Sequence, residues 1–223
     1  MKVSRHTFWA TNSSGDVSGI LMRPTGASCL YVFAHGAGAG MEHSFMEAAA
    51  GQLADRGIAS FRYNFPYKEA GKKLPNRTPI LIETVRSAVT EASLLSPGLP
   101  LFAGGKSMGG RMVSMAASRE PLPGVKGLVF FGFPFHLSGR DSAERGAHLA
   151  DVELPMLFLQ GTRDKLANLD LLIPLLDEVT PTPTLHIVDG ADHGFHVLKR
   201  SGRTASEALA EMCDVFRDWV GEI

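Results

Sequence analysis

The sequence predicts an α/β protein built on a parallel sheet with helices on both faces. From position 29 onward, continuous apolar runs of strand length alternate with segments of helical periodicity, and glycine or proline bounds each run. Such alternation is typical of a parallel sheet covered on both sides. The expected strands are Cys29–Ala34, Ile58–Tyr63, Leu101–Ala103, Val125–Phe131, Pro155–Leu159 and Thr184–Val188. The expected helices between them are Phe45–Arg56, Pro79–Leu95, Gly109–Arg119 and Leu169–Val179.

The two ends of the chain follow other patterns. Two short strands, Arg5–Thr11 and Val17–Met22, flank a cluster of turn-forming residues and predict a hairpin. Near the other end, Ala205–Val220 carries apolar residues on one face, as an amphipathic closing helix does. A length of 223 residues fits one core, so we expect a single domain over residues 1–223.

Composition narrows the classes of partner. The net charge of -1 provides no field to gather nucleic acid or an anionic membrane, so a small molecule is the expected partner. The first residues lack the apolar region of a signal peptide, and we expect a soluble, cytoplasmic protein. Cys29 and Cys213 are then expected to be buried thiols. Without clustered Cys and His, neither a metal nor another cofactor is expected.

The loop after the third parallel strand carries the most specific motif. Gly105-Lys106-Ser107-Met108-Gly109 matches G-x-S-x-G between an apolar strand and a helix-forming segment, the context that makes Ser107 a candidate nucleophile. Its strained turn would present the hydroxyl at the positive end of a helix. A phosphate-binding P-loop ending in Gly-Lys-Ser would need glycine at position 100, which is Pro100, so that alternative is disfavoured.

A serine nucleophile needs a base, and the base needs an acid that fixes its tautomer. Asp164 and His193 follow the next strand ends in the order Ser, Asp, His. Asp164 alone could be a helix cap. Among the histidines, His196 is the main competitor, but it falls three residues further from the strand and into an expected helix. We therefore prefer His193 as the base.

Two backbone amides would be needed to hold the developing oxyanion. One is expected from Met108, which follows the nucleophile, and the other from the glycine-rich loop after the first parallel strand, with Ala37 preferred and Gly38 next. A merely flexible glycine turn is the alternative. His35 is expected to order that loop. For Lys106 and Arg111, ion pairing that braces the turn is preferred over attraction of an anionic substrate.

Together these residues resemble a known family. Ala34-His35-Gly36-Ala37-Gly38, the run from Gly104 to Arg111, Gly132-Phe133-Pro134-Phe135-His136, Gln160-Gly161-Thr162-Arg163-Asp164 and Asp192-His193 look like the α/β-hydrolases of the dienelactone-hydrolase-like clan. Within it they resemble lid-less bacterial proteins similar to testis-expressed protein 30 and to the hydrolase-like domain of a chromatin-complex subunit. The resemblance implies a mostly parallel eight-stranded sheet and a triad of Ser107, Asp164 and His193. True dienelactone hydrolases use a cysteine nucleophile, whereas position 107 is serine.

These observations predict a serine hydrolase that cleaves an ester or thioester through an acyl-enzyme; a non-catalytic interaction module that keeps the fold is the alternative. The sequence does not indicate an oligomeric state. The connection 136–154 is short and charged, so no large lid is expected. The pocket walls would then come from strand-end loops and form a shallow site that favours short acyl chains. The expected lining is Phe65, Tyr67, Met108, Phe133, Phe135, His136 and Phe195.

Overall fold

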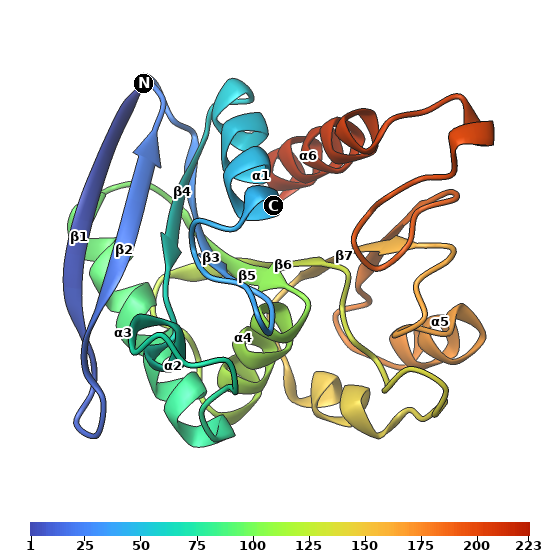
Figure 1. Ribbon diagram of the computed structural model, residues 1–223, viewed down its shortest axis with the longest axis horizontal. Coiled ribbons are helices and arrows are strands. Elements are labelled where there is room, and N and C mark those ends of the chain that lie inside the picture. Colours follow the sequence, from blue (N-terminus) through green and yellow to red (C-terminus); the bar gives the residue numbers. More distant parts are fainter.

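The computed structural model describes residues 1–223 and contains one eight-stranded sheet (Figure 1). The strand order is β1-β2-β4-β3-β5-β6-β7-β8. β1 pairs with β2 and β2 with β4 in antiparallel fashion, and all other pairs are parallel. The strands are β1 (Lys2–Thr11), β2 (Gly15–Arg23), β3 (Cys29–Ala34), β4 (Ile58–Tyr63), β5 (Leu101–Lys106), β6 (Val125–Phe131), β7 (Met156–Gly161) and β8 (Thr184–Val188).

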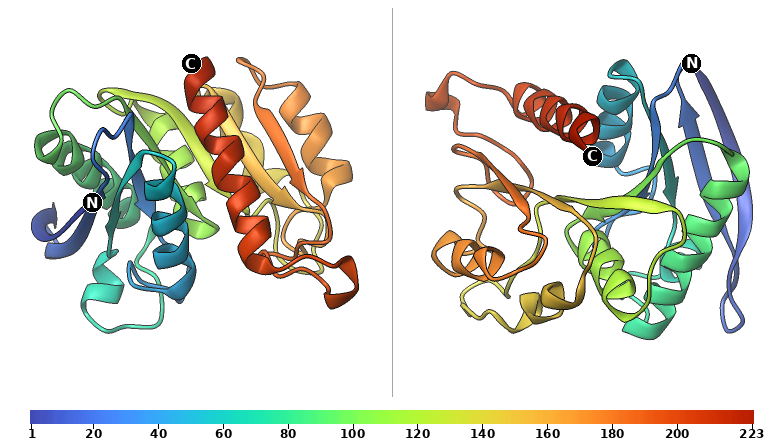
Figure 2. Two further views of the ribbon diagram at one scale, coloured as in Figure 1. Left: turned by 90° about the horizontal axis from the view of Figure 1, so that it is seen from above. Right: turned by 180° about the vertical axis from the view of Figure 1, so that it is seen from behind.

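Helices cover both faces of the sheet, as expected (Figures 1 and 2). Helices α1 (Ser44–Asp55) and α6 (Ala205–Glu222) lie on one face, and α3 (Thr78–Leu95), α4 (Met108–Arg119) and α5 (Leu169–Asp177) lie on the other. The sheet separates two apolar clusters because alternate side chains of each strand point to opposite faces. In β3, for example, Tyr31 packs under α1 and α6, whereas Val32 belongs to the larger cluster on the opposite face.

The structure contains the predicted strands and helices with small shifts at their ends. The end of β5 differs from the prediction in a way that determines where Ser107 lies. β5 continues to Lys106, past the expected end at Ala103, because Gly104 and Gly105 keep pairing with β3 and β6. A bulky residue could not replace either glycine: a Cβ on Gly104 would lie 1.8 Å from the Val129 carbonyl oxygen. The strand therefore runs directly into the turn that carries Ser107.

Three connections complete the fold. The one-turn helix α2 (Pro66–Glu69) follows β4 and was not predicted. Between β6 and β7 the chain forms one 3₁₀ segment, η1 (Glu144–Asp151), and no large lid, as expected. Another 3₁₀ turn, η2 (Lys199–Ser201), precedes α6. His196 lies in a loop, not in the helix expected there. Cys29 and Cys213 are buried free thiols, as predicted, and none of the helices is both long and apolar enough to cross a membrane.

Candidate active site

Ser107 lies at a strained turn between β5 and α4. Its backbone has φ 53° and ψ -121°, a conformation that non-glycine residues rarely adopt. The flanking glycines permit this close approach, since a Cβ on Gly105 or Gly109 would lie 2.5 or 2.4 Å from the Ala34 carbonyl oxygen. The sequence motif therefore forms the strand–turn–helix that it predicts, with the serine at the N-terminus of α4.

The structure brings Ser107, His193 and Asp164 together. The Nε2 atom of His193 lies 2.8 Å from Ser107 Oγ, and its Nδ1 atom lies 2.7 Å from Asp164 Oδ2. Asp164 is almost fully buried, and its Oδ1 atom accepts a hydrogen bond from the backbone N–H of Leu166. Asp164 thus closes a local turn, but it is not the helix cap that the sequence left open, because the N-cap of α5 is Asn168.

Gln160, at the end of β7, is a polar residue that the sequence analysis missed. Its Nε2 donates to Asp164 Oδ2 over 2.6 Å, while its Oε1 accepts from the backbone N–H of Phe133 over 2.9 Å. The side chain is fully buried, and the backbone donor fixes which end of the amide faces the carboxylate. The available signal was a single amide within the otherwise apolar run of β7.

The loop that carries His193 folds back on itself. Asp192 Oδ1 accepts hydrogen bonds from the backbone N–H groups of Gly194 and His196, and Phe195 adopts a left-handed φ of 63°. His196 points away, with 76% of its side chain exposed, and its ring faces Asp192. Its ring therefore does not share the contact between Ser107 and His193.

The glycine-rich loop after β3 is held by two buried side chains. His35 Nδ1 lies 2.8 Å from the Gly36 carbonyl oxygen, and its Nε2 accepts from the backbone N–H of Phe65. Burial lowers the pKa of His35 to about 4, so its ring is neutral at pH 7 and Nδ1 carries the proton. The Tyr67 hydroxyl donates to the Gly36 carbonyl oxygen over 3.5 Å.

The cavity beside Ser107 distinguishes the candidate oxyanion donors. Gly38 is not among the residues that line this cavity, which favours Ala37 as the donor from this loop. Ala37 lines the cavity beside Ser107. Met108 is the first residue of α4, where an N–H has no acceptor inside the helix. The expected donors thus lie beside the serine: Met108 follows it directly in the chain, and Ala37 lies in the wall of the cavity.

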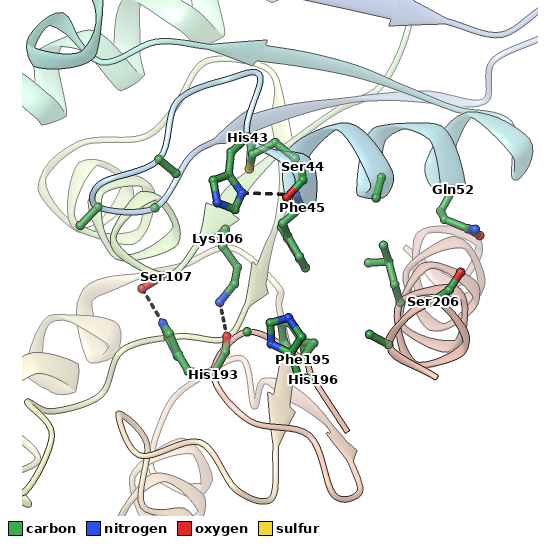
Figure 3. Close-up of a pocket in the computed structure, with 18 of the residues that line it drawn as sticks. His43, Ser44, Phe45, Gln52, Lys106, Ser107, His193, Phe195, His196 and Ser206 are labelled. Carbon is green, nitrogen blue, oxygen red and sulfur yellow. Dashed lines mark hydrogen bonds between the residues drawn. The ribbon is translucent and has the colours of Figure 1, made fainter. Parts of the chain in front are cut away.

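A cavity of 740 Å³ opens beside Ser107 and His193 (Figure 3). It extends between α1 and α6, so that Gln52 and Ser206 lie far from the serine. Its walls are mostly apolar or small, and Lys106 is the one Lys, Arg, Asp or Glu among the lining residues. Apolar side chains of the wall are Phe45, Met46, Ala48, Leu166, Phe195 and Leu209.

Most of the expected pocket lining is wrong. Phe195, itself almost fully buried, lines the cavity, whereas the buried side chains of Phe65, Tyr67, Phe133 and Phe135 do not, and Met108 packs against the larger apolar cluster. The strand-end aromatics turn inward because they fill the space beneath the loops; Phe133, for instance, packs edge-to-face on Phe130 and Phe158. His136 lines a separate polar cavity, where its Nε2 accepts from the Asn168 backbone N–H.

The expected ion pairs at the nucleophile turn are also absent. Neither Lys106 nor Arg111 lies within ion-pair distance of a carboxylate. Lys106 instead donates to the main-chain carbonyl of His193, and Arg111 Nε is buried without a partner. No group of three or more His, Cys, Asp or Glu side chains is placed to hold a metal ion.

This combination of a strained serine turn and a mostly parallel eight-stranded sheet defines the α/β-hydrolase fold. The chain matches the family described as alpha/beta hydrolase domain over residues 27–221, and it belongs to that family.

Solved structures agree on the fold. Dienelactone hydrolase from Anabaena variabilis is 20% identical, with a TM-score of 0.74 and coverage of 100% of this chain and 99% of that one. A serine hydrolase without lid from Xanthomonas campestris is 19% identical, with a TM-score of 0.75 and coverage of 98% and 95%. Est1E from Butyrivibrio proteoclasticus, solved with ferulic acid, is 17% identical, with a TM-score of 0.68 and coverage of 88% and 93%. The family match and the fold shared with these structures support hydrolase activity in general.

Proposed function

We propose that this protein is a serine hydrolase that cleaves an ester or thioester of a small substrate through an acyl-enzyme on Ser107. The observation that carries the proposal is the continuous hydrogen-bonded chain from Ser107 Oγ through His193 to Asp164, with distances of 2.8 and 2.7 Å. Nucleophile, base and acid within such reach are what acyl transfer requires. The cavity opens directly onto the serine, so a substrate carbonyl can approach it.

In the acylation step, Ser107 Oγ attacks the carbonyl carbon while His193 Nε2 takes the hydroxyl proton. Asp164 keeps the other ring proton on Nδ1 and stabilises the imidazolium that forms. The negative charge moves to the former carbonyl oxygen, where the amides of Met108 and Ala37 stabilise it. When the oxyanion collapses, the bond to the alcohol or thiol breaks, and His193 returns its proton to that leaving group.

Deacylation repeats the sequence with water as the nucleophile. His193 removes a proton from water, the resulting hydroxide adds to the acyl carbon, and Ser107 leaves with the proton that His193 returns. The products are the carboxylic acid and the free serine. This chemistry requires no cofactor. The partner that the protein needs for it is a small-molecule substrate. We also propose that the protein is cytoplasmic. The Gly-Lys-Ser-Met-Gly-Gly-Arg run supports a further proposal, that the chain is similar to the relatives of testis-expressed protein 30.

The cavity suggests what lies on one side of the scissile bond. Phe45 and Phe195 stack with ring centroids 5.9 Å apart and form an apolar wall close to the serine. Ala48 on α1 and Leu209 on α6 also line the cavity, each about one helical turn from a polar lining residue, Gln52 and Ser206 respectively. We therefore propose that an apolar acyl or alcohol group of moderate length occupies the groove between α1 and α6.

A fluorophosphonate probe tests the proposed function directly, because it labels a serine that a neighbouring base activates. We expect the probe to label the wild-type protein and not Ser107→Ala. The control is Ser114→Ala, which removes a serine about two turns further along α4, and it should be labelled like the wild type. An unlabelled wild-type protein, under conditions that label an established serine hydrolase, would contradict the proposal and favour a non-catalytic interaction module.

A further inference from the structure

Lys106 connects the nucleophile turn to the loop that carries His193. It is the last residue of β5, directly before Ser107, and its Nζ atom donates to the main-chain oxygen of His193 over 2.5 Å (Figure 3). The ammonium also lies 5.6 Å from the ring centroid of Phe45 and 5.1 Å from that of Phe195. One carbonyl and two aromatic faces therefore surround it.

A stabilising ion pair does not explain why the ammonium of Lys106 lies at this position. Burial has the largest effect on its pKa and lowers it to about 8, against which the more distant carboxylates of Asp164 and Asp192 act only in part. Removing an ammonium from water costs free energy that a carbonyl and two rings do not fully return. An apolar side chain of the same length is thus expected to be at least as favourable for folding.

The contact between Lys106 and the His193 carbonyl nevertheless fixes the distance between the His193 backbone and Ser107, on which the proposed reaction depends. Residues 106 and 107 are neighbours in the chain, so a bond from Lys106 to the His193 carbonyl sets how far the histidine backbone lies from the serine. The turn around His193 is otherwise closed mainly on itself through Asp192. Phe195, two residues further on, holds the other side of the ammonium.

We propose that Lys106 is a positioning residue: it aligns the His193 imidazole on Ser107 through the His193 main-chain carbonyl and the rings of Phe45 and Phe195. The inference rests on the proposed function. Phe45 belongs to α1 and also lines the substrate groove, so the wall of the groove takes part in the same arrangement.

The decisive variant is Lys106→Met, which keeps length and apolar contact but removes the donor. We expect kcat on a p-nitrophenyl ester to fall by about tenfold to a hundredfold, with KM changed by no more than about twofold. The thermal midpoint should not fall. Lys126→Met, on the exposed side of β6 near its start, is the matched control and should leave kcat, KM and the midpoint unchanged.

A pH profile separates positioning from a general structural role. The charged and titratable groups around the ammonium are Asp164, Asp192, His193 and, along the cavity, His43 and His196. In the wild type, kcat should decline as the pH rises through about 8, because Lys106 there becomes a neutral amine, which donates more weakly to the His193 carbonyl and is no longer attracted to the two rings. Lys106→Arg retains a charged donor and should recover part of kcat and shift this decline to higher pH. In Lys106→Met the decline should be absent.

The outcomes distinguish the two proposals. If the wild type hydrolyses esters and Lys106→Met keeps its kcat and its alkaline decline, the positioning role is refuted while the proposed function stands. A rise in KM at unchanged kcat would also refute it and indicate that Lys106 contributes to substrate binding and not to the alignment of His193. If Lys106→Met does not fold, Phe45→Leu supplies the test, and an unaltered kcat there overturns the inference. A wild type that neither reacts with the probe nor hydrolyses esters refutes the proposed function itself.

Discussion

Gln160 offers the sharpest test of how the buried acid is held. The change Gln160→Leu preserves approximate volume and removes both polar contacts of the amide. The backbone N–H of Phe133 would be left without a partner in a fully buried position, and Asp164 would lose a donor 2.6 Å away. An unsatisfied buried N–H costs about 1–3 kcal/mol, and a hydrogen bond to a charged group contributes about 1.5–3 kcal/mol.

Because the two contacts share one side chain and do not add fully, we expect the free energy of unfolding to fall by about 2–5 kcal/mol. Urea denaturation followed by circular dichroism measures this at pH 7. The matched control is Gln52→Leu, the other glutamine, which lies partly exposed on α1 and should change stability by less than about 1 kcal/mol.

A second variant separates the two contacts. Gln160→Glu keeps an acceptor for the Phe133 N–H but places a carboxylate next to Asp164, so it should be less stable at pH 8 than at pH 5. Both variants should also lower kcat at least tenfold, since Asp164 is no longer held against His193. A loss of less than 1 kcal/mol in Gln160→Leu, with kcat unchanged, would refute the role assigned to this amide.

Three further predictions address the base, the buried lysine and the groove. Ser107→Ala and His193→Ala should each remove most ester turnover and combine without further loss, whereas His196→Ala should be mild; a severe His196→Ala would reverse the assignment of the base. Because its pKa of about 8 in the folded protein lies below the ordinary value of 10.5, Lys106 destabilises the fold below pH 8. Urea denaturation should therefore show wild type gaining stability relative to Lys106→Met between pH 8 and 10.5, by at most about 3 kcal/mol, and a constant difference would contradict the shift. Ala48→Phe should narrow the groove and lower kcat/KM for hexanoyl esters about tenfold more than for acetyl esters. Equal losses on both esters would place the acyl chain elsewhere.

Much of the fold could be predicted because its determinants are local. The apolar runs that form β3 to β7 are bounded by residues that end strands, and each is followed by a helical period. The turn at Ser107 could be predicted for a related reason: only glycine tolerates the close approach of the Ala34 carbonyl at positions 105 and 109. Asp164 and His193 follow strand ends, which parallel pairing brings to one edge.

What could not be predicted depends on the paths of loops. Phe65 and Phe133 follow strand ends just as Phe195 does, yet the first two turn into the core and the third faces the cavity. The direction of such a side chain is set by backbone angles that composition does not reveal, such as the left-handed φ of Phe195. The partner of Lys106 was missed for a similar reason, because a main-chain carbonyl 87 residues away leaves no mark in the sequence.

The buried polar contacts around the site share one arrangement. The loop after β3 is held by His35 and Tyr67, Asp164 is held by Gln160, and the His193 backbone is held by Lys106. Each of these side chains comes from a strand end or from the first few residues after a strand. With no large lid between β6 and β7, no closing segment is available to assemble the site around a substrate. An open site of this kind must have its geometry in place before the substrate arrives, and strand ends with buried or partly buried polar contacts are the elements able to provide it.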